Sequence, residues 1–102
     1  MSEKSLTNKE LEELLVAEID NTIGKKSEII VFNDDFNTFD WVIQSLMEVC
    51  KHSFDQSEQL SILIHFKGKA TVKTGPFGEL KPMKDLLVER GLSAVIESFQ
   101  EK

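Results

Sequence analysis

No unbroken apolar stretch in this chain is longer than four residues, and this limits what the chain can fold into. A membrane-spanning helix needs about 20 apolar residues in succession, so we expect no membrane-spanning helix. The stretch Ile29–Phe32 is rich in β-branched residues and predicts a short buried strand. The 102 residues suit one domain with a single core.

Residues 1–27 contain no aromatic residue and differ in this from the rest of the chain. Thr7 and Glu10 are spaced as in a capping box. Apolar residues then recur at helical spacing: Leu11, Leu14, Leu15 and Ile19. We therefore expect a flexible N-terminal arm, able to form a short helix, before a globular domain over residues 28–102.

A first helix is expected after Asn37 or Thr38, either of which can serve as its N-cap. Its apolar stripe follows the i, i+3, i+4, i+7 pattern and consists of Phe39, Val42, Ile43, Leu46, Val49 and Cys50. A second helix is expected from Asp55, which forms a second capping-box pattern with Glu58, to a stop at Gly68. Apolar residues between 60 and 66 also alternate with period two, so a strand is the alternative there.

The last third of the chain predicts a strand, a helix and a final strand. Residues 69–74 alternate polar and apolar, and a Gly-Pro turn over residues 75–78 ends them. The helix is expected from Glu79 to Arg90, with Pro82 in its first turn and Gly91 as its stop. Its inner stripe would be Met83, Leu86 and Leu87, and the final strand would include Val95 and Ile96.

The order of these elements predicts an α+β fold. A β-α-α-β-α-β chain forms two layers most simply when its helices cover one face of a three-stranded antiparallel sheet. The composition suits such a domain, since 40% of the residues are hydrophobic.

Charge narrows the range of partners. Twelve Lys and Arg residues stand against eighteen Asp and Glu, which gives a net charge of −6. An acidic protein repels phosphate backbones and anionic lipids, so we expect neither nucleic acid nor membrane as a partner. A cationic ligand suits this chain better.

A polar cluster, Asn33-Asp34-Asp35, follows the first predicted strand directly. Its carboxylate and amide oxygens are hydrogen-bond acceptors, and a primary ammonium with three donors complements them. The alternative is that the cluster only forms a turn and caps the next helix.

Other reactive residues give weaker indications. His65 lies among apolar residues and could be a buried core side chain or a functional one, whereas His52 looks like part of an exposed connection. A metal site could draw on Asp34, Asp35 and His65, but no close ligand spacing supports it. Cys50 lies on an apolar stripe, which favours a core role over a nucleophilic thiolate. We therefore expect no catalysis, no cofactor and no metal.

The location of the protein is also suggested by its sequence. The N-terminus lacks the basic and apolar segments of a signal peptide, and a single cysteine allows no internal disulfide. We expect a cytoplasmic monomer.

Two separated segments of the chain are informative together: VFNDDFNTFDWV at residues 31–42 and IHFKGKA at residues 64–70. Both resemble segments of the ClpS family of bacterial Clp protease adaptors. The resemblance extends over residues 28–97 and implies a non-catalytic adaptor for N-degrons, which are substrates with a free α-amino group and a bulky hydrophobic first residue. Its partner would be a ClpA-like or ClpC-like AAA+ unfoldase that feeds the ClpP peptidase.

The resemblance also implies roles for individual residues. Asn33, Asp35 and His65 should bind the α-ammonium group, with Asp34 in support. The first side chain of the substrate should enter a hydrophobic pocket, whose residues would be Asn37, Phe39, Val42, Ser61, Ile64 and Leu92. Unfoldase docking is assigned to Glu79 and Lys84.

The chain departs from the family pattern inside the implied pocket. Asn37-Thr38-Phe39 replaces the Thr-Pro-Met of many members, and the Phe narrows and stiffens that wall. Ser61 replaces a Met that screens incoming side chains in some members.

The alternative function is a generic acidic protein-protein interaction domain without an N-degron pocket.

Overall fold

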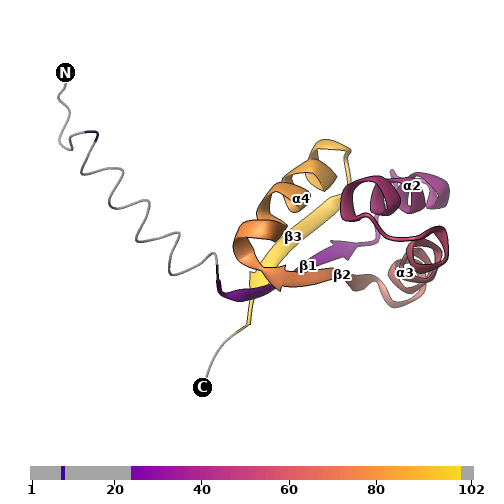
Figure 1. Ribbon diagram of the computed structural model, residues 1–102. Helices are drawn as coiled ribbons and strands as arrows, with labels where there is room; N and C mark the ends of the chain where they lie inside the picture. Colours follow the sequence, from indigo (N-terminus) through magenta and orange to yellow (C-terminus); the bar gives the residue numbers. More distant parts are fainter. Residues whose placement is uncertain (1–7, 9–23, 100–102) are drawn as a thin grey trace.

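The computed structural model describes residue 8 and residues 24–99. Over residues 24–99 the helices and strands follow the predicted β-α-α-β-α-β order, and the α+β fold is confirmed (Figure 1). They are β1 (Lys26–Phe32), α2 (Phe39–Cys50), α3 (Phe54–Lys67), β2 (Lys69–Pro76), α4 (Phe77–Glu89) and β3 (Ser93–Ser98). The capping pair predicted at Thr7 and Glu10, and the helical spacing after it, lie outside the described residues.

The three strands form one antiparallel sheet in the order β2-β1-β3. The central strand begins at Lys26, earlier than the apolar stretch at Ile29 suggests. Ser27 is fully buried and its hydroxyl lies 3.1 Å from that of Ser98 on β3, so pairing with a neighbouring strand extends β1 beyond its apolar residues.

The core lies on one face of the sheet. Alternation along β1 turns Ile29 and Val31, which are 0% and 1% exposed, toward all three helices. The helical residues packed against them are Leu46, Val49 and Cys50 from α2, Leu60 and Ile64 from α3, and Leu80 and Leu87 from α4. No helix in the described part of the chain is long and apolar enough to cross a membrane.

Helix α2 begins where the sequence predicts. The Thr38 hydroxyl accepts a hydrogen bond from the backbone N–H of Trp41 at 3.0 Å, which makes Thr38 the N-cap. The helix ends at Cys50, and Lys51 adopts a left-handed backbone with φ of 63°.

Helix α3 settles the ambiguity between helix and strand. Ser53, rather than Asp55, is its N-cap and accepts from the N–H of Gln56 at 3.1 Å. Burial follows a helical period along it and leaves Phe66 78% exposed, which a period-two strand would not do. Gly68, at φ of 93°, ends the helix as expected.

Helix α4 begins two residues earlier than predicted, at Phe77, so Pro82 lies in its second turn. Its inner stripe also differs from the prediction, because Leu80 is buried whereas Leu86 is 48% exposed. The predicted stop at Gly91 is correct. Gly91 has φ of 93° and donates to the Val88 carbonyl at 2.9 Å.

His52 is not simply part of an exposed connection. Its Nε2 lies 2.6 Å from the carbonyl oxygen of Val72, in the middle of β2. Since β2 is an edge strand, this contact satisfies a backbone group on that strand and gives His52 a structural role.

Candidate functional site

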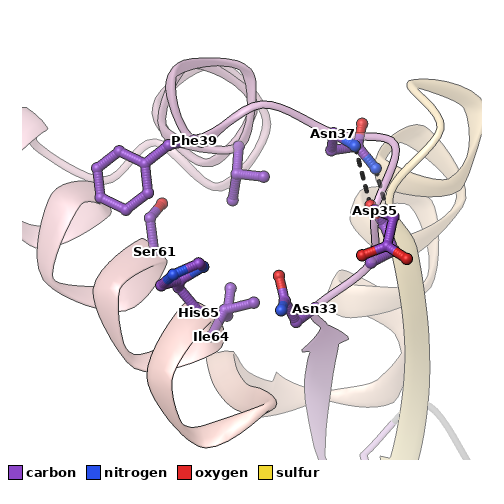
Figure 2. Close-up of a pocket in the computed structure, with 9 residues that line it drawn as sticks. Asn33, Asp35, Asn37, Phe39, Ser61, Ile64 and His65 are labelled. Atoms are coloured by element: carbon purple, nitrogen blue, oxygen red, sulfur yellow. Dashed lines mark hydrogen bonds between the residues drawn. The ribbon is translucent and has the colours of Figure 1, made fainter.

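A cavity of about 420 Å³ opens where the loop after β1 meets α2 and α3 (Figure 2). Its volume is within the range of small-ligand pockets. The lining residues are Asn33, Asp34, Asp35, Asn37, Phe39, Val42, Ser61, Ile64 and His65. All but one of the residues that the family resemblance assigns to ammonium binding and to the hydrophobic pocket thus line one cavity.

Leu92 is the exception, because it lies in the core and does not line the cavity. It is 4% exposed, and its N–H donates to the Leu87 carbonyl at 3.0 Å. This bond belongs to the turn that closes α4 around Gly91, and such turns direct the following apolar side chain back toward the helix. Leu92 is therefore not among the residues that line this cavity, and its place at the border of the pocket stays a prediction.

One backbone hydrogen bond joins the two halves of the site. The N–H of Asn33, directly after β1, donates to the carbonyl of Gly68, directly after α3, at 2.9 Å. Gly68 caps the helix that carries His65, so this bond fixes the polar cluster beside the end of that helix.

Asp34 organises the loop instead of pointing a free carboxylate at a ligand. Its Oδ1 accepts from the backbone N–H groups of Phe36 and Asn37, both at 2.9 Å. Its Oδ2 accepts from Asn37 Nδ2 at 2.8 Å and from the Ser93 hydroxyl at 3.1 Å. These bonds favour the turn interpretation for Asp34 itself, and a metal ion bound by Asp34 would have to displace them.

The same contacts set the ionisation of Asp34. Partial burial acts to raise the pKa of Asp34, but the hydrogen bonds from Asn37, Phe36 and Ser93 together outweigh it and leave the pKa below its usual value. The ionised carboxylate of Asp34 therefore holds the loop in place.

Asn37 ties the loop to the other side of the domain. Its Nδ2 donates to the carbonyl of Gly91 at 2.9 Å as well as to Asp34, so both amide hydrogens are used. Nearby, Trp41 Nε1 donates to the carbonyl of Arg90 at 3.0 Å, and the Arg90 guanidinium lies over the Trp41 ring. Sequence reasoning missed the contacts of Trp41, Ser93 and Gly91 because each joins residues at least 49 positions apart in the chain.

The side chains of Asn33, Asp35 and His65 remain available to a ligand. None of them makes a side-chain hydrogen bond to another described residue, and all three residues are exposed at the opening. His65 is therefore not the buried core histidine that the sequence also allowed. Figure 2 shows His65 on α3 across the opening from Asp35, with Asn33 between them at the end of β1.

The remaining wall of the cavity is mainly apolar. Ile64 and Ser61 are 3% and 2% exposed and form its buried part, with Val42 half-buried beside them. Phe39 is 42% exposed and forms the outer edge. The cavity thus has acceptors at its mouth and apolar surface deeper inside.

Glu79 and Lys84 lie on α4 and do not line this cavity. Glu79 is exposed in the first turn, and Lys84 Nζ forms an ion pair with Asp85 at 3.0 Å. Cys50 is fully buried, and this burial raises the pKa of its thiol. A high pKa disfavours the thiolate, which supports the core role of Cys50.

Comparisons with known proteins agree with the fold and with the sequence resemblance. Residues 24–95 match the family model described as "ATP-dependent Clp protease adaptor protein ClpS". The chain is also similar to the ClpS adapter of Thermosynechococcus vestitus, with 34% identity over 65% of this chain and 71% of that protein. The ClpS adapter of Acetivibrio thermocellus is 29% identical over 88% of this chain and 84% of its own length.

The fold also resembles that of a solved structure, Agrobacterium tumefaciens ClpS2 bound to L-phenylalaninamide. The TM-score is 0.62 at 24% identity, over 74% of this chain and 99% of that one. Since the family model spans most of this chain, the protein belongs to the ClpS family of ATP-dependent Clp protease adaptors.

Proposed function

We propose that this protein is a non-catalytic adaptor that binds N-degrons and delivers them to a Clp unfoldase. The supporting observation is the cavity itself, in which free hydrogen-bond acceptors at the mouth adjoin buried apolar surface. A free α-amino group and a bulky hydrophobic first side chain are joined at one carbon atom, so one ligand can use both parts of the cavity.

The polar end suits an ammonium group. Asn33 Oδ1, a carboxylate oxygen of Asp35 and a ring nitrogen of neutral His65 can each accept one of its three N–H donors. Hydrogen bonds to a charged group each contribute about 1.5–3 kcal/mol.

The apolar end adds a contribution of similar size. Burying a Leu or Phe side chain against Val42 and Ile64 contributes about 1.5–3 kcal/mol. Association and ordering oppose binding by at least about 4 kcal/mol. Together the two ends can reach an affinity on the order of micromolar, and neither suffices alone.

The ligand of the solved relative is consistent with this assignment. L-phenylalaninamide, bound to Agrobacterium ClpS2, has a free α-amino group next to an apolar phenyl side chain. These are the two groups for which the cavity of the present chain offers partners.

The test is peptide binding measured by fluorescence polarisation. Labelled peptides that begin with Leu or Phe should bind, whereas the same peptides acetylated at the N-terminus should lose binding, because an acetylated amine carries no charge. Asp35→Asn and His65→Ala should weaken binding at least tenfold, because the first removes the negative charge that faces the ammonium and the second removes a hydrogen-bond acceptor. Asp40→Asn changes a carboxylate outside the lining residues and serves as the matched control.

A generic interaction domain gives the opposite result. It would bind or ignore peptides irrespective of their first residue and of acetylation. Equal titration curves for the free and acetylated peptides would therefore refute N-degron recognition.

Delivery requires a surface that remains accessible when the cavity is occupied. Helix α4 provides one, since Glu79 and Lys84 lie outside the lining residues. We propose that a ClpA-like or ClpC-like unfoldase docks there. Reversing both charges, Glu79→Lys with Lys84→Glu, should abolish unfoldase capture while leaving peptide affinity unchanged.

A further inference from the structure

Ser61 is a polar residue in the buried, mainly apolar part of the cavity wall. It is 2% exposed, and its Oγ has no hydrogen-bond partner among the described residues. Buried hydroxyl groups are nearly always paired, because leaving one without a partner is unfavourable. Ser61 is thus a hydrogen-bonding group that the protein itself leaves unused.

The position of Ser61 relates it to the deep end of a bound side chain. It lies one helical turn before His65 on α3, about 6 Å along the axis, so both residues face the same cavity. Figure 2 shows Ser61 between Phe39 and His65 on the cavity wall. His65 is exposed at the mouth whereas Ser61 is buried, so a ligand held by its amine at His65 extends its side chain toward Ser61.

We propose that the Ser61 hydroxyl binds the phenolic hydroxyl of an N-terminal tyrosine, so that Tyr is preferred over Phe as the first residue. This inference rests on the proposed function. The Ser61 hydroxyl is one atom beyond Cβ, and a change of rotamer brings it into the cavity. A phenol both donates and accepts, so it complements whichever role the serine hydroxyl takes.

Selection against phenylalanine follows from the same geometry. Phe offers nothing to Ser61, which then remains unpartnered in the complex, whereas Tyr satisfies both hydroxyl groups. Sites built to bind a substrate hydroxyl reject the analogue that lacks it for this reason.

The test compares two free-amine peptides that differ only in Tyr or Phe at the first position. Wild-type protein should bind the Tyr peptide about twofold to tenfold more tightly, the range that one neutral hydrogen bond provides. Ser61→Ala should reduce this ratio to one or below.

Ser57→Ala is the matched control. Ser57 lies on the same helix, is fully buried and has an equally unpartnered hydroxyl among the described residues, but it does not line the cavity. This variant should keep the wild-type preference. Ser61→Cys provides a second test if Ser61→Ala proves unstable, because a thiol of similar size bonds weakly and should also lower the ratio.

The outcomes separate this inference from the proposed function. A wild-type ratio of one or below, or a preference for Tyr that survives both Ser61 variants, overturns the role of Ser61. If both peptides still lose binding on acetylation, N-degron recognition stands without it. If neither free peptide binds, the proposed function and this inference both fail.

Discussion

The backbone N–H of Asn33 donates to the carbonyl of Gly68 at 2.9 Å, and this bond joins two residues 35 positions apart, one in each of the two sequence motifs. One motif ends the central strand and the other ends α3. The polar cluster and His65 therefore lie at one opening because the ends of β1 and α3 are hydrogen-bonded through their backbones. No direct bond between the described side chains of the two segments is needed.

Gly68 should be sensitive to substitution for conformational reasons alone. Its φ of 93° is unfavourable for residues with a Cβ, although a Cβ there would meet no atom within 4 Å. We expect Gly68→Ala to lower the free energy of unfolding by about 1 kcal/mol, measured by urea denaturation. Gly24→Ala is the control because it also meets open space but has no such φ, and it should change stability little. An equal loss in both variants would contradict this explanation.

Asp34 should make stability depend on pH. Its pKa is lower in the folded state than in the unfolded chain, so it stabilises the fold above the unfolded value near 3.8. This contribution is lost as the pH falls through the folded pKa. Asp34→Asn should therefore be less stable than wild type at pH 7, and the difference should shrink steadily below about pH 4. A difference that stays constant between pH 7 and pH 3 would show that the ionised carboxylate is not responsible.

Trp41 should stabilise the contact between α2 and the end of α4. Trp41→Phe removes the hydrogen bond from Nε1 to the Arg90 carbonyl but keeps an aromatic ring. We expect a loss of about 1 kcal/mol in the free energy of unfolding. Peptide affinity should remain unchanged, since Trp41 does not line the cavity. A large loss of affinity in a fully folded variant would instead make Trp41 part of the binding site.

Cys50 should be unreactive in the native protein. It is fully buried and its thiol pKa is raised by that burial, so both access and thiolate formation are disfavoured. A thiol reagent such as iodoacetamide at pH 8 should modify it slowly in buffer and rapidly in denaturing urea, followed by mass spectrometry. Rapid stoichiometric labelling without denaturant would contradict the core role.

The element order could be predicted from local patterns because each element carries its own periodicity and stop. Gly68 and Gly91 close α3 and α4 as their spacing predicts. Thr38, one of the two N-cap candidates that the sequence offers, caps α2. The boundaries of the helices and strands differ from the predicted ones where tertiary contacts determine them. Ser27 belongs to β1 because Ser98 on the neighbouring strand supplies a partner for its hydroxyl. No property of residues 24–28 indicates this partner.

The sequence by itself determined the order of strands and helices and the identity of most of the lining residues, because these follow from local periodicity and from motifs that resemble a family. Only the tertiary structure decided which residues face a common space. It engaged Asp34 with Ser93, 59 residues away, buried Leu92 in the core and left the Ser61 hydroxyl unpartnered in the cavity wall. Such outcomes depend on distances between elements, and side-chain spacing along the chain carries no information about them.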